Sequence, residues 1–516
     1  MVTTLPAATG FLAVASPDSG VALRPAFAAQ GSRTVVRESN GRQHLYAVLL
    51  HGGAVPDGSV ARRGGTAVLL AGELYNQPDL CSLLPDGAAA DSDVHLVLAL
   101  LDRYGVSAFR LLNGRFAVVA MLGNRVLLAT DHVGSVPLYV TARPGQVAAA
   151  TEAKSLAGTA GVGVPPGARS LAALPGVRSL AALPGVCQLR AGMVLEIDVA
   201  KGATDVHRTW RPPLERRILP EGEATDLVRD TLRHAVRART GTDTPLVVIS
   251  GGIDSSSVAA LAVEAAGGAT IDTLAMGSEH DNEFPEARTV AEHLATRHSE
   301  IVVPTADLLA QLPYAVWAAE TTNVDIIEYL LPLTALYLRV GDTPRRILTG
   351  YGADIPLGGM HREGRLPALE QAVSHDMATF DGLNEMTPVL SAVGGHWSTH
   401  PFWDREVLAV LTSLEAGLKH RYGRDKWVLR TAMADLLPAT TVNRPKLGVH
   451  EGSGTTAAFS ALLVSAGVPP SQLREAKYLV LQALFRRVVA NGEHPDAVDF
   501  AKTVDEVAGM QRRSVG

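Results

Sequence analysis

Short apolar runs separated by turn residues dominate the first 200 residues of the chain. Three of them, residues 65–72 (GTAVLLAG), 115–121 (RFAVVAM) and 125–130 (RVLLAT), have the length and composition of β-strands. A stretch with a helical pattern, residues 93–104, lies between the first and the second of these strands. This part of the chain is therefore predicted to be an α+β domain built on layered sheets.

The pattern changes after a proline-rich segment at residues 210–213 and 219–220. Such segments are typical of domain boundaries, so we expect one domain at residues 1–209 and a second at 210–516. From Glu221 onward the pattern is helical, and a strand, a tight loop and a helix then follow at residues 247–256 (VVISGGIDSS). A second apolar strand at residues 271–276 completes a βαβ unit, which predicts an α/β domain with a parallel sheet.

The loop at the end of the first of these strands is typical of a phosphate site. Gly251 and Gly252 allow backbone N–H groups to turn toward an anion, and Ser255 can cap the following helix and donate its hydroxyl. Asp254 would repel a bare phosphate, which indicates a Mg²⁺ ion between the two. No lysine follows the glycines, so this is not a Walker-A loop. The loop resembles that of the ATP pyrophosphatases, which implies ATP contacts from Val248, Ser250, Gly251, Gly252, Asp254, Ser255 and Ser256.

The bulk properties narrow the function classes. A hydrophobic content of 47% and a charged content of 19% are typical of a globular protein, and a net charge of −6 offers no basic surface for nucleic acid. Only Cys81 and Cys187 are present, which argues against a disulfide framework. Neither a signal peptide nor an apolar run of about 20 residues is visible. A soluble cytoplasmic protein that acts on a small molecule, without a membrane partner, is the resulting expectation, and a homodimer stays open.

One nine-residue sequence occurs twice in tandem. Residues 169–177 and 178–186 both read RSLAALPGV. Proline and glycine in each copy prevent one long helix, and two short units cannot form a solenoid. The duplication is therefore predicted to lie in a surface loop, and one copy is predicted to be dispensable.

Four segments of the N-terminal half resemble, in order, the glutamine-hydrolysing domain of class B asparagine synthetases. They are residues 72–76 (GELYN), 112–117 (LNGRFA), 131–139 (DHVGSVPLY) and 150–156 (ATEAKSL). The resemblance implies an Ntn-amidotransferase-like fold. In that family a cysteine at the mature N-terminus attacks the glutamine amide, whereas position 2 here is Val2. The N-terminal domain is therefore predicted to be an inactive, structural version of the amidotransferase.

The C-terminal half resembles the synthetase domain of the same family, with a second phosphate and metal loop at residues 349–354 (TGYGAD). Asparagine synthetases carry a glutamate where this chain has Tyr351. A closer resemblance is to the β-lactam synthetases, through residues 325–333, 349–361, 375–385 and 443–454. It implies that ATP and Mg²⁺ serve to adenylate a carboxylate of N2-(2-carboxyethyl)-arginine. The substrate's own amine then closes a β-lactam ring, giving deoxyguanidinoproclavaminate, AMP and pyrophosphate.

The same resemblance implies a role for each matching residue. Tyr351 and Glu385 form the dyad that removes the amine proton, and Lys446 offsets negative charge on the reacting centre and binds the α-phosphate. Asp254 and Asp354 hold Mg²⁺. Further ATP contacts are expected from Met276 and Gly350, and substrate contacts from Tyr329, Gly352, Glu385 and Asp376, with Asp376 facing the guanidinium.

Three alternatives remain at this stage. A carbapenam synthetase would close the same ring on a proline-derived diacid and would not need Asp376. An ammonia-dependent ligase of the asparagine synthetase type is disfavoured by Tyr351. A non-enzymatic paralogue is disfavoured by the intact Asp254, Tyr351, Glu385 and Lys446.

Overall fold

The structure of the protein is a computed structural model that describes most of the chain. The described residues are 5–52, 59–85, 92–143, 145–157, 171–213, 215–240, 244–279, 282–359, 361, 366–379, 388–445 and 454–515. Val2, Glu385 and Lys446 lie outside them.

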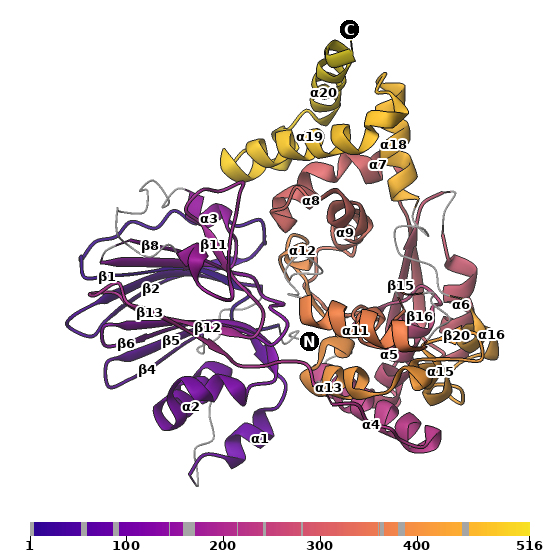
Figure 1. The fold of residues 1–516 in the computed structure, drawn as a ribbon, viewed down its shortest axis with the longest axis horizontal. Helices are drawn as coiled ribbons and strands as arrows, with labels where there is room; N and C mark the ends of the chain where they lie inside the picture. The colour runs from indigo at the N-terminus through magenta and orange to yellow at the C-terminus, as the bar shows by residue number, and fades with distance from the viewer. Residues whose placement is uncertain are drawn as a thin grey trace.

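The N-terminal half consists of two stacked antiparallel sheets (Figure 1). The first has the strand order β10 (Val177–Ser179), β11 (Cys187–Leu189), β8 (Leu138–Arg143), β9 (Gln146–Ala150), β1 (Gly10–Ser16), β3 (His44–His51), β2 (Ser32–Ser39). The second has the order β13 (Thr204–Arg208), β12 (Met193–Asp198), β7 (Arg125–Thr130), β6 (Gly114–Leu122), β5 (Thr66–Leu74), β4 (Val60–Arg63). The helices of this half are α1 (Gln77–Ser82), α2 (Asp93–Tyr104) and α3 (Lys154–Ala157). The predicted strands and the helix at residues 93–104 are confirmed.

Side chains alternate between the two faces of each strand, which explains how the first sheet packs against the second sheet on one face and against helices on the other. In β1, Phe11 and Ala13 point between the two sheets, whereas Leu12 and Val14 point to the opposite face. That opposite face joins a core built with helices of the C-terminal half, including residues of α8 (Leu312–Ala319) and α19 (Leu473–Phe485). Helix α2 covers the outer face of the second sheet. Strand β1, near the middle of the first sheet, is thus buried on both faces, which is why it is apolar almost throughout.

The C-terminal half is built on a parallel sheet of five strands. Its order is β16 (Arg297–Val302), β15 (Asp272–Gly277), β14 (Leu246–Val248), β17 (Arg346–Leu348), β18 (Trp397–Thr399). The chain winds outward from β14 in both directions, as in doubly wound folds, and helices cover both faces of the sheet (Figure 1). The predicted combination of a layered-sheet half and an α/β half is therefore confirmed. The division at residue 209 stays a prediction; it lies between β13 and α4, which begins at Glu221.

The remaining elements are mostly helices of this half. They are α4 (Glu221–Thr240), α5 (Ile253–Ala265), α6 (Phe284–His293), α7 (Thr305–Ala310), α9 (Val324–Tyr337), α10 (Asp354–Leu357), α11 (Leu366–Thr379), α12 (Pro388–Ala392), α13 (Arg405–Ser413), α14 (Ala416–Lys419), α15 (Trp427–Ala432), α16 (Ala439–Asn443), α18 (Thr455–Ser465), α20 (Phe500–Val515) and the hairpin β19 (His420–Arg421) and β20 (Arg424–Asp425). Within the described ranges, none of the helices is both long and apolar enough to cross a membrane.

The tandem repeat lies at the surface, where the alanines of both copies are exposed, but its leucines and valines are buried or half-buried, which the sequence did not predict. In each copy the two leucines and the valine are spaced three residues apart and form the same two turns. The N–H of the second leucine donates to the carbonyl of the first, and the N–H of the valine donates to the carbonyl of the second leucine. The copies bury these side chains in different cores. Val177 of the first copy lies between the two antiparallel sheets, and Val186 of the second faces the C-terminal helices. Proline and glycine shape the turns, but the three-residue spacing keeps the apolar side chains on one side.

The two copies provide a matched test of this packing. Leu174 and Leu183 occupy the same position of the repeat, but Leu183 is 6% exposed and belongs to the core, whereas Leu174 is half-buried. We expect Leu183→Ala to lower the free energy of unfolding by about 2–5 kcal/mol, and Leu174→Ala to lower it clearly less. Urea unfolding of the full chain measures both. Equal losses for the two variants, or no loss at Leu183, would contradict the assignment.

Candidate active site

The two glycine-rich loops meet at the point where the strand order of the parallel sheet reverses. One loop joins β14 to α5 and the other joins β17 to α10, and these two strands are neighbours. Ligands of doubly wound sheets bind at this point, beyond the carboxyl ends of the strands. The approach is close, because a Cβ atom added to Gly350 would lie 2.3 Å from the backbone nitrogen of Ser255. Sequence reasoning identified both loops, and the topology brings them together.

The first loop is a compact turn held by its own serines. Gly251 has a φ of +72°, and a Cβ atom there would lie 2.4 Å from Cβ of Glu286, so only glycine fits. The N–H of Ser250 donates to Oγ of Ser255 at 3.1 Å, which closes the loop over the start of α5. Ser256 is completely buried, unlike Ser250 and Ser255, so its hydroxyl does not face the loop surface.

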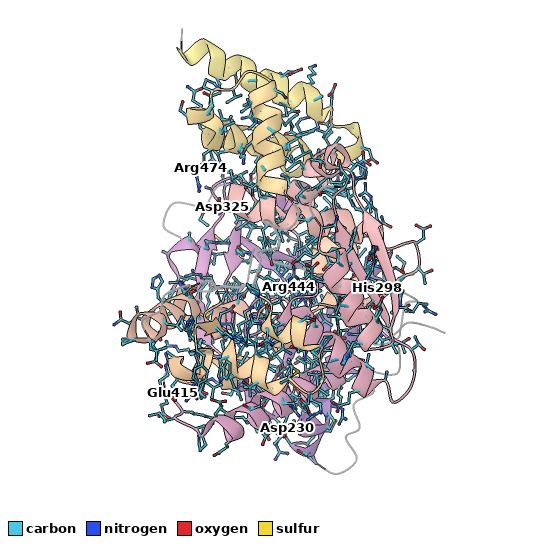
Figure 2. All side chains as sticks on the ribbon, turned by 90° about the vertical axis from the view of Figure 1, so that its right-hand side faces the viewer. Asp230, His298, Asp325, Glu415, Arg444 and Arg474 are labelled. Atoms are coloured by element: carbon cyan, nitrogen blue, oxygen red, sulfur yellow. The ribbon has the colours of Figure 1, made fainter. Side chains whose placement is uncertain are left out.

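The other predicted ATP contacts lie at the ends of the neighbouring strands. Val248 is the last residue of β14, and Met276 is next to last in β15. Both are partly buried. The side chain of Arg444, which is labelled in Figure 2, donates to the carbonyl of Ser250 at 3.1 Å and forms an ion pair of 2.7 Å with Glu283. The arginine of the segment that leads to Lys446 is therefore fixed to the phosphate loop.

A buried lysine that sequence reasoning did not identify joins the two predicted metal ligands. Lys426, whose side chain is 0% exposed, contacts Asp254 and lies 2.6 Å from Oδ1 of Asp354. Burial opposes its charge, but the two carboxylates outweigh burial and raise the pKa of Lys426. Its backbone is left-handed, with a φ of 53°. Nothing in the local sequence distinguishes this lysine; its place follows from the approach of α15 to the sheet.

The donor set fits a magnesium ion shared with phosphate groups. Mg²⁺ in such sites takes one or two carboxylates and completes its shell with water and substrate phosphates. Asp254 and Asp354 could supply the two carboxylates, and Lys426 is the cation that lies between them in this structure. A cluster of three or more metal-ligating side chains does not occur in the described part of the chain.

Tyr351 lies in a box of aromatic side chains. Its ring centre is 4.9 Å from that of Trp403, 5.6 Å from that of His400 and 5.9 Å from that of Tyr329. Gly352 has a φ of +99°, and a Cβ atom there would lie 2.0 Å from the Trp403 ring. The glycine therefore allows the loop to pass under the tryptophan. Of the predicted substrate residues, Tyr329 and Gly352 are thus at Tyr351.

Asp376 lies on α11, where His361 already contacts it. Nε2 of His361 is 2.6 Å from Oδ2 of Asp376, and both side chains are about one quarter exposed. His361 therefore orients the Asp376 carboxylate. A guanidinium bound there would share this carboxylate with the His361 ring. The predicted roles of Glu385 and Lys446 fall on residues outside the described ranges.

The comparisons with known proteins agree with this geometry. Residues 227–385 and 395–503 match the asparagine synthase family, and residues 42–158 match the glutamine amidotransferase domain. The carboxyethyl-arginine beta-lactam-synthase of Streptomyces clavuligerus is 58% identical over 516 residues, which cover 99% of this chain and 98% of that protein. Two glutamine-hydrolyzing asparagine synthetases of Arabidopsis thaliana are 27% and 26% identical over 418 residues, 75% of this chain and 67% of each relative.

A doubly wound sheet with a pyrophosphate-type loop, joined to an amidotransferase-type half, defines the class as a ligase that activates a carboxylate. The chain belongs to the asparagine synthase family.

Proposed function

We propose that the protein closes a β-lactam ring on N2-(2-carboxyethyl)-arginine at the expense of ATP, with release of AMP and pyrophosphate. The observation that carries this proposal is the place of Tyr351, on the loop that meets the phosphate loop and within the aromatic box. A tyrosine there can serve a proton transfer on an amine next to the activated carboxyl group. The similarity to the Streptomyces clavuligerus enzyme over nearly the whole chain supports the substrate.

The first step requires position and charge more than covalent chemistry. The substrate carboxylate must stand in line with the α-phosphorus of ATP, and the charge of the leaving pyrophosphate must be offset. The loop at residues 250–255 offers N–H donors and the hydroxyls of Ser250 and Ser255, and Lys426 places a buried positive charge between the loops. A bound Mg²⁺ would supply further charge compensation. Asp254 and Asp354 would hold it.

The second step requires removal of a proton from the attacking amine. Tyr351 is assigned as the group that receives this proton and Glu385 as the group that makes the phenol a competent base. Lys446 is assigned to the negative charge that develops on the tetrahedral oxygen. The aromatic box surrounds the Tyr351 ring on several sides and restricts water, which would otherwise hydrolyse the acyl-adenylate. Asp376 is assigned to the guanidinium, with His361 as its present partner.

A pyrophosphate-release assay with four substrates tests the proposal. We expect pyrophosphate and a lactam only with carboxyethyl-arginine, because only this substrate combines a guanidinium for Asp376 with an amine for Tyr351. Aspartate with ammonia and a proline-derived diacid should give neither. Glutamine should release no glutamate, since Val2 replaces the nucleophile of the amidotransferase. Turnover of aspartate or of the proline-derived diacid, or none with carboxyethyl-arginine, would exclude the assignment.

A further inference from the structure

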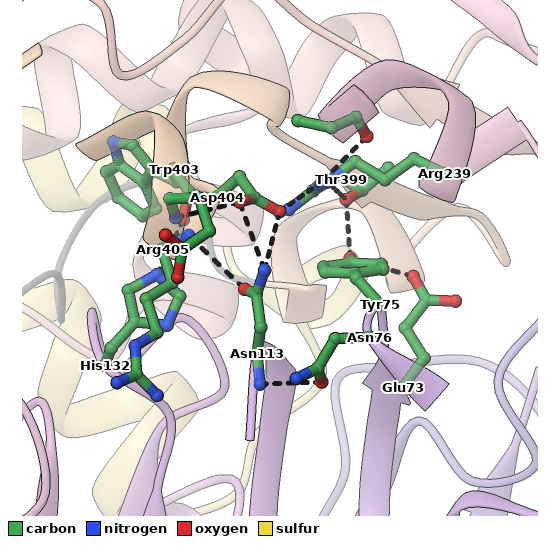
Figure 3. Close-up of polar contacts among 12 residues, drawn as sticks. Glu73, Tyr75, Asn76, Asn113, His132, Arg239, Thr399, Trp403, Asp404 and Arg405 are labelled. Carbon is green, nitrogen blue, oxygen red and sulfur yellow. Dashed lines mark hydrogen bonds and ion pairs between the residues drawn. The ribbon is translucent and has the colours of Figure 1, made fainter. Parts of the chain in front are cut away.

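A layer of buried polar contacts joins the N-terminal half to the two strands that lead into the candidate site. Figure 3 shows the part of this layer around Tyr75, Thr399, Asn113 and Asp404. At its centre is Glu73, at the end of β5. Its carboxylate accepts two hydrogen bonds of 2.8 Å from the Arg346 guanidinium, one of 2.9 Å from Nε1 of Trp397 and one of 3.0 Å from the Tyr75 hydroxyl. We call Glu73, Arg346 and Trp397 the Glu73 clamp.

The clamp bridges two residues that are partners in the sheet. Arg346 is the first residue of β17, Trp397 is the first residue of β18, and the two are paired in register. One carboxylate from the other half of the chain therefore holds the starting points of both strands. The Glu73 and Arg346 side chains are only 12% and 10% exposed. Burial opposes ionisation of Glu73, but the charge and hydrogen bonds of Arg346 outweigh it and lower the pKa of Glu73.

The second of these strands depends on contacts from outside its own sheet. Strand β18 has three residues and stands at the edge of the sheet, so among the described strands it pairs with β17 alone. Side chains of the N-terminal half support it. Arg115 donates to the carbonyl of Ser398, and the Tyr75 hydroxyl lies 2.7 Å from Oγ1 of Thr399. Every residue of β18 is thus contacted by the N-terminal half.

The ends of the same two strands carry the aromatic box. Thr349 and Tyr351 follow β17, and His400 and Trp403 follow β18. Oγ1 of Thr349 lies 2.7 Å from Nδ1 of His400 and accepts a 3.2 Å hydrogen bond from the N–H of Tyr351. A shift of one strand along the other would therefore move Tyr351 relative to His400 and Trp403.

A second contact reaches the box directly. Nε2 of His132 lies 2.8 Å from the carbonyl of Trp403. A carbonyl oxygen only accepts, so Nε2 of His132 is the donor in this contact. Burial lowers the pKa of His132. Next to it, Asn113 donates to both oxygens of Asp404 at 3.1 Å (Figure 3). Trp403, which packs against the Tyr351 ring, is thus held in place by the N-terminal half.

We infer that the N-terminal half positions Tyr351 for ring closure, and that Glu73 is the positioning residue through which it acts. The inference rests on the proposed function of Tyr351. Glu73 does not touch the reacting atoms; it sets the register of β17 and β18. Adenylation depends on the loop after β14 and on Gly350 and Asp354 after β17, and β17 stays paired with β14 when the clamp is lost. The strand that loses its support is β18 at the sheet edge, which leads to His400 and Trp403. Loss of the clamp should therefore affect ring closure more than adenylation.

Single-turnover measurements on the full chain with ATP and carboxyethyl-arginine test this selectivity. In Glu73→Gln we expect ring closure to slow by roughly 10- to 100-fold, because a small misplacement of reacting groups has an effect of this size. The rate of adenylate formation should stay within about 3-fold of the parental rate. Arg405→Ala is the matched control. It removes hydrogen bonds from Arg405 to the carbonyls of Arg110 and Leu112 across the same interface, without contact to β17 or β18, and should keep the parental rates.

Combination with Tyr351→Phe shows whether Glu73 acts through the tyrosine. If it does, adding Glu73→Gln to Tyr351→Phe slows ring closure little further, because both substitutions remove the same contribution of the Tyr351 hydroxyl to ring closure. The inference would be overturned if the effects of the two substitutions on ring closure multiply in the double variant. It would also be overturned if Glu73→Gln slows adenylation and ring closure equally, or leaves ring closure within 2-fold of the parental rate. A parent chain that forms no lactam would instead reject the proposed function.

A milder variant covers the case in which Glu73→Gln does not fold. Tyr75→Phe removes the hydroxyl that contacts Glu73 and Thr399 and leaves no charge without its partner. We expect it to slow ring closure by roughly 3- to 10-fold with adenylation unchanged. Parental ring closure in a folded Tyr75→Phe protein would count against the clamp.

Discussion

Replacement of Tyr351 by phenylalanine should stop the reaction between its two chemical steps. Adenylation needs no proton from the amine, because the attacking carboxylate is already ionised near pH 7. Ring closure needs that proton removed. Tyr351→Phe, and likewise Glu385→Gln, should therefore form and accumulate the acyl-adenylate, with only a slow residual formation of lactam. Rapid-quench analysis that quantifies adenylate and lactam in one turnover measures the effect.

Lys446→Ala is the informative comparison for this prediction. The phosphorus centre and the tetrahedral carbon both build up negative charge, and an ammonium near both should serve both steps. We expect Lys446→Ala to slow adenylation and ring closure together, by about 100- to 1000-fold, the usual cost of removing such a charge. If Tyr351→Phe forms the lactam at the parental rate, Tyr351 is only a wall of the pocket.

The largest effect on stability is expected at a second contact between the two halves. The Lys154 ammonium lies 2.6 Å from a carboxylate oxygen of Glu152 and 3.1 Å from one of Glu320, and the three side chains are 1–3% exposed. Lys154→Met would leave two carboxylates buried without their cation. We expect the free energy of unfolding to fall by about 3–5 kcal/mol. Lys502→Met, at an exposed position of α20, should change it by no more than about 0.5 kcal/mol.

The loss at Lys154 should depend on pH with a definite sign. Burial raises the pKa of Glu320 even beside the lysine, and removal of the ammonium should raise it further. The penalty is present in full above that raised pKa. It disappears as the pH falls toward the ordinary value for glutamate, about 4.3, because the buried carboxyl then binds a proton. Urea unfolding of parent and variant at pH 7.5 and 5 measures the difference. A loss that stays constant or grows toward pH 5 would contradict the assignment.

Elements set by local patterns could be predicted from the sequence. The strands of the first half, the helix at residues 93–104 and both glycine-rich loops were recognised, since the apolar periodicity and the glycines that mark them are local. Gly251 is an example. Its conformation is a property of the loop itself, and the close approach of Glu286 only reinforces it.

Packing between distant segments could not be predicted in the same way. The two copies of the repeat have identical sequences, yet one packs between the antiparallel sheets and the other against the C-terminal helices. Their burial depends on which surface each copy meets. The prediction of a surface loop considered proline and glycine but gave too little weight to the spacing of the apolar residues, so it missed the burial of the leucines and valines.

The family, the phosphate loop and the candidate Tyr351 were determined by the sequence alone, because a motif needs only neighbouring residues to be recognised. The tertiary structure decided what surrounds them. Lys426 reaches Asp254 and Asp354 from the turn that precedes α15, and Glu73 reaches Arg346 across 273 residues of chain. In sequence these are an ordinary lysine and glutamate. Their roles arise because folding removes them from water, and a buried charge needs a partner at hydrogen-bonding distance wherever in the chain that partner lies.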